Sequence, residues 1–284
     1  MRDLLIGSVE DLPVLPAVAS ELMGLDASSE SYFDNVVELV KSEPRFAARV
    51  LAVANSVAAA SQAEIATLRG AVARIGSVNV PNLVLGMAIA QGSSGDDPTV
   101  RCFWRHSLEV AMGASQLAAL TGDLETPPEE AYAIGLLHDI GRILIHRHGP
   151  PALGSPDESE SCGLVEAEIA FLGVTHAELG ALACRRWGLP ERFEVCVRYH
   201  HPKADDEIPC DMEKLIQLVA ATDQVLFPAD RLVSRIGGQG EEDELLASIM
   251  AALPPALQLE KLILHQLLRG VIADAAAVLN AIWC

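Results

Sequence analysis

Apolar residues recur along this chain in the pattern of amphipathic helices. The segment Tyr32–Ser42 is an example, with apolar residues at Val36, Val37, Leu39 and Val40. Such spacing places apolar side chains on one face of an α-helix. The hydrophobic pattern therefore predicts a chain of helices.

Proline, glycine and capping residues mark the ends of these predicted helices. Pro16 and Pro44 stand at helix-start positions, where a missing backbone N–H costs little. Thr175 and Glu178 have the spacing of a capping box, which places His176 in the first turn of a helix. Besides the helix after Pro16, the predicted helices cover Tyr32–Ser42, Arg45–Ala60, Val78–Gln91, Val100–Leu120, Pro127 towards His138, a segment from Thr175, and Asp211–Leu226.

Polar loops separate the helices. The clearest is Gly92–Pro98, which predicts a boundary between two all-α parts. We therefore expect an N-terminal helical subdomain over residues 1–95 and a second helical domain over residues 96–284. Further surface loops are expected at Gly149–Ser161 and Gly237–Asp243, followed by a tail of two or three helices rich in Leu and Ala.

The composition agrees with a helical protein of the cytoplasm. Of 284 residues, 50% are hydrophobic but only 4% are aromatic, which favours helices over a pleated sheet. The six cysteines form no CxxC motif, as is typical of a reducing compartment. No apolar run reaches the roughly 18 residues of a membrane span, and the start lacks the apolar block of a signal peptide. We therefore expect a cytoplasmic location.

The charge of the chain is strongly acidic. Twenty basic and thirty-nine acidic residues give a formal net charge of −19. A field of this sign repels phosphate backbones and anionic lipid. The sequence therefore predicts partners other than nucleic acid or a membrane surface.

Histidine carries the candidate chemistry. Each of the eight histidines, taken singly, is more often a core or surface residue than a ligand. A His-Asp step is itself expected by chance about half the time at this composition. The constellation is more informative, because imidazoles and carboxylates at several helix ends can converge as a metal site. The set is His106, His138, Asp139, His176, His200, His201 and Asp223.

The adjacent residues His138 and Asp139 suit a site with two metal ions. An imidazole can bind one ion while the two oxygens of a carboxylate bridge to a second. Neutral imidazole with anionic carboxylate favours Fe, Mn, Ni or Zn over Ca or Mg, and the absence of clustered cysteine argues against structural zinc. The sequence therefore predicts one or two divalent transition-metal ions.

Blocks of residues in a fixed order carry a resemblance to a known family. His106, then His138-Asp139, then Asp223 follows the H…HD…D pattern of the HD metal-dependent phosphohydrolases. The other blocks are Leu12-Pro13-Val14-Leu15-Pro16, Pro44–Ser56, Ala71–Gly76, Asn82–Leu85, Trp104–Ser107, Gly135–Gly141, His176–Gly180, Trp187–Pro190 and His200-His201-Pro202. Together they are far more specific than one motif. The chain resembles the HDOD family, the HD-related output domain of bacterial signalling proteins.

This resemblance implies a fold, a role and a ligand set. The fold is an N-terminal helical bundle packed on an HD-type helical domain. The role is in signal transduction, beside receiver or sensor components. A first metal would be held by His106, His138, Asp139 and Asp223. A second would be held by Asp139, His176, His200 and His201.

The chain also departs from the related HD-GYP phosphodiesterases. Cys102 stands where some of them have a carboxylate, and Arg142 stands where they usually have a lysine. The segment Pro202–Asp206 replaces their Gly-Tyr-Pro motif. These departures argue against a third metal and against cleavage of cyclic di-GMP.

Two functions follow as hypotheses. The favoured one is a regulatory output module that passes a signal to partner proteins and keeps a structural or ligand-sensing metal site. The other is a phosphohydrolase in which a metal-bound hydroxide attacks a phosphorylated small molecule, with Asp139 and Arg142 as candidate catalytic residues. Either Arg142 or Lys203 would steady the phosphate. The module is favoured because fold and ligands alone do not establish turnover.

The remaining distinctive residues have simpler interpretations. Asn55-Ser56 is interpreted as a buried hydrogen-bonding pair that fixes the N-terminal bundle. Trp104 and Trp187 are expected in the core, because large aromatic rings have much area to bury. Glu166 and Glu168 are interpreted as a solvated face, with one of them as an alternative partner of the metal site.

Overall fold

All regular secondary structure in the computed structural model is helical. No strand occurs among the residues that it describes, so the prediction of an all-α fold is confirmed. The structure describes residues 1–12, 15–56, 65–90, 97–121, 127–153, 161–203, 205–235 and 261–283.

The chain divides into two compact units. The first consists of Met1–Leu12 and Pro98–Ala273, and the second of Pro13–Asp97 and Asp274–Cys284. Most of the predicted linker, Gly92–Pro98, lies outside the described residues, so the predicted domain limits stay a prediction. The predicted loop before the tail lies outside them as well.

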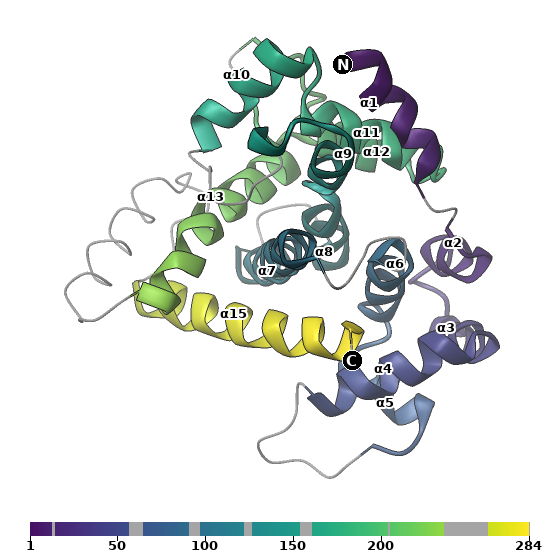
Figure 1. The fold of residues 1–284 in the computed structure, drawn as a ribbon. Coiled ribbons are helices and arrows are strands. Elements are labelled where there is room, and N and C mark those ends of the chain that lie inside the picture. Colours follow the sequence, from purple (N-terminus) through teal and green to yellow (C-terminus); the bar gives the residue numbers. More distant parts are fainter. Residues whose placement is uncertain are drawn as a thin grey trace. The chain divides into compact units, whose positions relative to one another are not determined.

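The second unit contains a bundle in which α4 packs against α5, and α6 packs against α2 and α4 (Figure 1). Its helices are α2 (Ala17–Met23), α3 (Tyr32–Ser42), α4 (Pro44–Ser56), α5 (Leu68–Ile75), α6 (Val80–Ala90) and the end of α15 (Lys261–Trp283). Asn55 donates hydrogen bonds from Nδ2 to the carbonyl oxygens of Leu51 and Ile65, and accepts one from the Ile65 N–H. Asn55 thus ties the end of α4 to the residues before α5.

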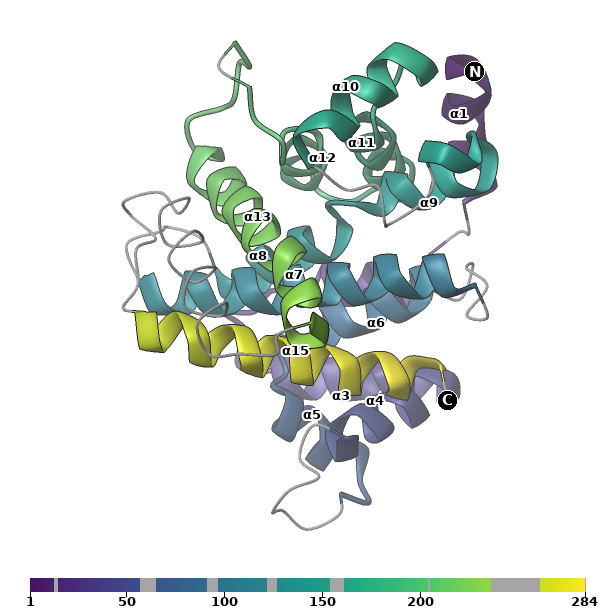
Figure 2. The same ribbon diagram turned by 60° about the vertical axis from the view of Figure 1, so that its left-hand side comes forward.

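The first unit holds every candidate ligand. In it α7 packs along α8, and α13 contacts both (Figure 2). Figure 1 shows α9, α11 and α12 close together, and α11 contacts the other two. The elements are α1 (Arg2–Ser8), η1 (Val9–Asp11), α7 (Pro98–Thr121), α8 (Pro128–Leu137), α9 (Ile140–His148), η2 (Pro151–Leu153), α10 (Ser161–Leu172), α11 (His176–Arg186), α12 (Glu191–Arg198), α13 (Glu213–Arg235) and the start of α15.

Local capping explains where the helices of the site begin. The Thr175 hydroxyl accepts a hydrogen bond from the Glu178 N–H at 3.1 Å, and the Glu178 carboxylate accepts one from the Thr175 N–H at 2.9 Å. The predicted capping box is therefore confirmed, and α11 begins at His176. The helix α8 begins at Pro128, as its proline and acidic residues predict.

The predicted start of α6 at Val78 is wrong by two residues. Gly76 has a φ of 94°, in the left-handed region that favours glycine, and a turn over residues 77–79 follows it. The Asn79 side chain donates a hydrogen bond to the Ile75 carbonyl at 2.9 Å, which closes this turn. The helix therefore begins only at Val80.

The predicted core aromatics are buried, with 3% of Trp104 and 8% of Trp187 exposed. The core of the described part is otherwise mostly aliphatic, with a few further aromatic rings such as Phe46, Phe103 and Phe193. Among the described helices, no single one combines the length and apolar character of a membrane span. Two sharply bent helix pairs meet that criterion only when their members are taken together.

Candidate metal centre

Helix ends in the first unit bring the candidate ligands together. His138 caps the end of α8, and Asp139 caps the start of α9, so the two neighbours occupy the tight connection between these helices. His176 is the first residue of α11. His200 and His201 directly follow Tyr199, the C-cap of α12.

A glycine contact sets the distance between α9 and α11. A Cβ atom at Gly141 would lie 2.0 Å from the His176 carbonyl oxygen and 2.9 Å from the Gly180 nitrogen. These are backbone atoms, which cannot move aside without separating the two helices. Glycine at position 141 therefore lets Asp139 and His176 approach each other.

The first group of candidate ligands lies around His106 in α7 and Asp223 in α13. His106 Nε2 lies 2.9 Å from Asp223 Oδ1. His138 Nε2 lies 3.6 Å from Asp223 Oδ1 and 3.6 Å from Asp139 Oδ2. His106, His138 and Asp139 each offer a ligand atom within 4.8 Å of the others.

The second group lies on the other oxygen of Asp139. Its Oδ1 lies 3.3 Å from His176 Nε2 and 3.7 Å from His200 Nε2. His176 Nε2 lies 3.1 Å from the Nε2 atoms of both His200 and His201. Each oxygen of Asp139 thus faces a separate group of imidazoles, the arrangement that a bridging carboxylate needs. The structure brings all seven predicted residues together, and their role as ligands stays a prediction.

The imidazoles present lone pairs to the centre of this cluster. His138 Nδ1 donates to the Gly135 carbonyl at 2.7 Å, and His200 Nδ1 donates to the Val197 carbonyl at 2.7 Å. A carbonyl can only accept, so Nδ1 carries the proton in both rings and Nε2 is the donor atom for a metal. His138 Nε2 is buried without a hydrogen-bond partner in the described part of the chain. Its environment is that of a metal ligand.

Close contacts between ring nitrogens also favour a cation. The Nε2 atoms of His176 and His200 lie 3.1 Å apart, although the Nδ1 protons of both rings face acceptors elsewhere. Two facing lone pairs repel, and a proton or a metal ion between them removes the repulsion. The donor set of five imidazoles and two carboxylates, without a thiolate, suits a divalent transition metal.

Burial and charge shift the pKa values of the cluster in opposite directions. Burial lowers the pKa of His138, but the carboxylates of Asp139 and Asp223 outweigh it and raise that pKa to about 9. Burial and the neighbouring imidazoles lower the pKa of His201 to about 2. Burial raises the pKa of Asp139, but nearby positive groups hold it well below its usual range. The carboxylates therefore favour a cation at His138 Nε2, either a proton or a metal ion that replaces it, while burial keeps His201 neutral.

Arg142, the second candidate catalytic residue, is directed into the protein. Its Nη1 donates to Asp139 Oδ2 at 3.2 Å, and only 7% of the residue is exposed. The guanidinium lies 5.0 Å from the centroid of the Phe103 ring, a cation–π arrangement. Arg142 therefore acts as the counter-ion of Asp139.

Glu168 belongs to the site, and its interpretation as part of a solvated face is wrong. Only 1% of Glu168 is exposed, whereas Glu166 on the same helix is exposed. The Glu168 carboxylate accepts hydrogen bonds from the His176 N–H at 2.9 Å and from His176 Nδ1 at 2.8 Å. One sequence signal marks it: Glu168 stands in the apolar helical stripe of Leu164 and Leu172, where a carboxylate needs a partner.

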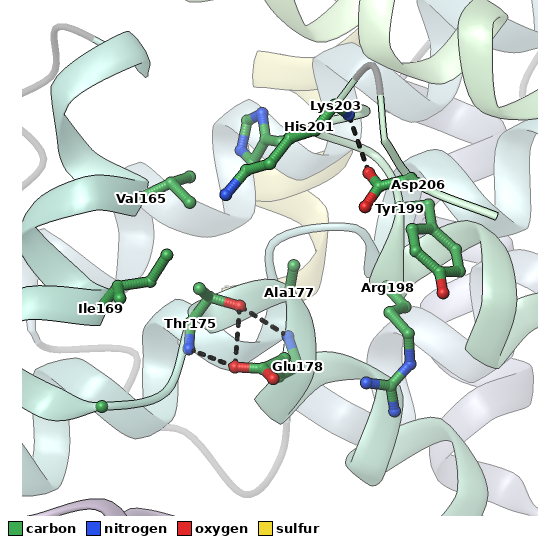
Figure 3. A pocket seen from close by; sticks show the side chains of 11 residues that line it. Val165, Ile169, Thr175, Ala177, Glu178, Arg198, Tyr199, His201, Lys203 and Asp206 are labelled. Carbon is green, nitrogen blue, oxygen red and sulfur yellow. Dashed lines mark hydrogen bonds between the residues drawn. The ribbon is translucent and has the colours of Figure 1, made fainter. Parts of the chain in front are cut away.

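A pocket of about 450 Å³ opens beside His201 (Figure 3). Val165 and Ile169 of α10 form an apolar wall. The charged lining consists of two cations, Arg198 and Lys203, and two carboxylates, Glu178 and Asp206. In Figure 3 the Lys203 side chain extends across the pocket towards Val165. The pocket could admit a small molecule to the His201 side of the cluster. Arg142 is not among its lining residues.

Comparison with known proteins places this geometry in a family context. The family model of the HDOD domain matches residues 12–203. The crystal structure of a candidate phosphohydrolase from Shewanella amazonensis SB2B is similar, with a TM-score of 0.72 and 26% sequence identity over 98% of this chain and 97% of that chain.

Two further relatives are longer than this chain. The crystal structure of a candidate signal transduction protein from Marinobacter aquaeolei VT8 has a TM-score of 0.68 and 24% identity, over 96% of this chain and 60% of that chain. An uncharacterized protein of Treponema pallidum (strain Nichols) is 24% identical over 204 residues, which are 70% of this chain and 40% of that protein. The chain thus spans about two fifths of the curated relative.

Proposed function

The chain belongs to the HDOD domain family, and on that premise we propose that it is an output module of bacterial signal transduction that holds one or two divalent transition-metal ions. Its partners would be receiver or sensor components of the same signalling system. The candidate signal transduction protein from Marinobacter supports this role by its name and fold.

One observation gives the main support for the proposed metal centre. His138 Nε2 is buried without a hydrogen-bond partner in the described part of the chain and faces two carboxylates. A buried polar atom without a partner is costly, and a bound cation satisfies it. In this proposal His106, His138, Asp139 and Asp223 hold one ion, and Asp139, His176, His200 and His201 hold the other. The ions would supply Lewis acidity and a fixed positive charge.

The direction of Arg142 supports a module over an enzyme. A residue that steadies a phosphate has to reach the side from which the substrate enters. Arg142 is buried against Asp139 and Phe103 and does not line the pocket beside His201. Arg142 therefore neutralises Asp139 inside the protein and does not contact a molecule in this pocket.

A phosphohydrolase is the second candidate, and the pocket favours it. The pocket gives His201 an open side, and Arg198 and Lys203 offer charge-assisted hydrogen bonds to a phosphorylated small molecule. The candidate phosphohydrolase from Shewanella amazonensis also supports this alternative.

Elemental analysis tests the proposed metal centre. The protein is prepared without a metal-affinity tag, reconstituted separately with Fe, Mn, Ni and Zn, and desalted. We expect about one to two ions per chain. Asp139→Ala should retain less than half of the wild-type metal, because Asp139 faces both groups. Asp205→Ala, at an exposed position outside the cluster, should retain all of it. Sub-stoichiometric metal in the reconstituted wild type would refute the proposal.

A further inference from the structure

We propose that Glu168 is a positioning residue of the metal centre, which holds the His176 ring with Nε2 towards the cluster and links α10 to metal binding. The proposal rests on the proposed metal centre. Glu168 lies eight residues before His176, on a different helix, and the sequence alone left open whether Glu166 or Glu168 is a partner of the metal site.

The contacts of Glu168 constrain His176 at two points. Oε2 lies 2.9 Å from the His176 backbone nitrogen and 2.8 Å from its Nδ1, and Oε1 lies 2.9 Å from Nδ1. One carboxylate therefore holds both the first residue of α11 and the orientation of its ring. With Nδ1–H donated to Glu168, the lone pair of Nε2 points at Asp139, 3.3 Å away.

The charge of Glu168 matters as well as its geometry. A carboxylate on the far nitrogen makes an imidazole a stronger metal ligand and fixes its tautomer. Glu168 and His176 are both buried, so water competes little for these hydrogen bonds. Glu168 thereby prepares His176 as a donor before any metal binds.

A role in starting α11 does not explain these contacts. The capping box of Thr175 and Glu178 already serves the start of that helix. Capping requires only the bond to the His176 N–H, whereas Glu168 also places both oxygens within 2.9 Å of Nδ1. The hydrogen bonds from Nδ1 of the His176 ring to Glu168 are the contacts that orient Nε2 as a metal ligand.

The same helix forms a wall of the pocket. Val165 and Ile169 of α10 line it, and Glu168 lies between them in sequence (Figure 3). A metal that fixes His176 also fixes Glu168, and with it this stretch of α10. Thermodynamic linkage makes this coupling reciprocal. If metal binding stabilises the position of α10 by a certain free energy, a change that displaces α10 weakens metal binding by the same free energy. Metal occupancy would in this way change the pocket wall.

Metal affinity tests the proposal, with a matched control on the same helix. Dissociation constants are measured by chelator competition for the wild type, Glu168→Gln and Glu166→Gln. In Glu168→Gln the amide oxygen can still accept one hydrogen bond from His176. The amide NH₂ replaces the second carboxylate oxygen and cannot accept from the His176 N–H groups, and the negative charge is lost. We expect its affinity to fall about 10- to 100-fold. Glu166→Gln changes an exposed residue and should bind as the wild type does. Equal affinity of Glu168→Gln and the wild type would overturn the proposal.

Two further readouts separate ring positioning from general stability. In the metal-free protein, ¹⁵N NMR of His176 should show protonated Nδ1 in the wild type and a mixture of ring states in Glu168→Gln. Metal should slow hydrogen exchange of residues 164–172 in the wild type and in Glu166→Gln, but less in Glu168→Gln. Identical ring signals in the wild type and Glu168→Gln would refute the positioning role. A wild type that binds no metal would refute the proposed function instead, and the NMR result would still decide what Glu168 does.

Discussion

Asp139 and Arg142 form a buried ion pair within the candidate metal centre. Both are buried, and Arg142 Nη1 lies 3.2 Å from Asp139 Oδ2. Burying an ion pair adds little net stability, but removing one partner is costly because it leaves a buried charge uncompensated. The oxygen that Arg142 contacts is also the one that faces His138. In the proposed metal centre, a metal ion and Arg142 would therefore share the charge of one carboxylate.

Arg142→Met should destabilise the metal-free protein more than the metal-loaded protein. Methionine keeps an apolar contact with Phe103 but removes the cation beside Asp139, which should lower the unfolding free energy by about 3 kcal/mol. A bound metal would replace most of that charge and reduce the loss. Urea denaturation with and without metal measures both values. Arg45→Met, at an exposed position of α4, is the control and should change stability by about 0.5 kcal/mol or less. Equal losses with and without metal would contradict this account.

The convergence of the seven predicted residues could be anticipated from the sequence, because their types and order form a one-dimensional pattern. The sequence did not decide between Glu166 and Glu168 as a partner of the metal site, because the importance of Glu168 depends on burial. Its neighbour Glu166 has the same chemistry and is exposed. Only the packing of α10 decides which of the two carboxylates meets His176. The inward direction of Arg142 depends likewise on Phe103, 39 positions earlier in the chain.

At the scale of the helices, the site depends on how α9 and α11 meet. The start of α11 was predictable, because its capping box lies within four consecutive residues. The start of α6 was not, because it depends on the backbone of Gly76 and a side-chain bond from Asn79. The close approach at Gly141 also depends on tertiary structure, since the atoms it meets belong to α11.

Gly141→Ala should disrupt both packing and metal binding. The new methyl group would overlap the His176 carbonyl oxygen, and the helices would have to separate. Overpacking against backbone costs about 3 kcal/mol or more, and His176 should move away from Asp139. Chemical denaturation and elemental analysis measure the two effects.

Gly7→Ala in α1 is the matched control for this substitution. No heavy atom lies within 4 Å of the added Cβ, so the variant should be neutral or gain up to about 1 kcal/mol from helix propensity. A Gly141→Ala protein that is as stable as Gly7→Ala and keeps its metal would show that α9 and α11 can separate freely.

At the scale of the whole molecule, the net charge and the pocket act in opposite directions. A formal charge of −19 repels anions from a distance, whereas Arg198 and Lys203 attract them at the pocket, where the carboxylates of Glu178 and Asp206 oppose that attraction. The pocket was not predictable, because its lining comes from α10, the start of α11 and the residues after α12.

We expect the metal-loaded wild type to show no hydrolysis above background of bis(p-nitrophenyl) phosphate or of nucleotides, with any of Fe, Mn, Ni or Zn. The physical reason is the placement of Arg142, which neutralises Asp139 inside the protein instead of charge that develops on a transferred phosphate. Measurements at several salt concentrations are needed, since screening over about 10 Å at 0.1 M salt would relieve the long-range repulsion of anionic substrates. Asp139→Ala and the exposed variant Asp205→Ala are tested beside the wild type. Turnover that requires metal, disappears in Asp139→Ala and persists in Asp205→Ala would establish the phosphohydrolase and displace the output module, because no contaminating enzyme would respond to a single carboxylate of this chain.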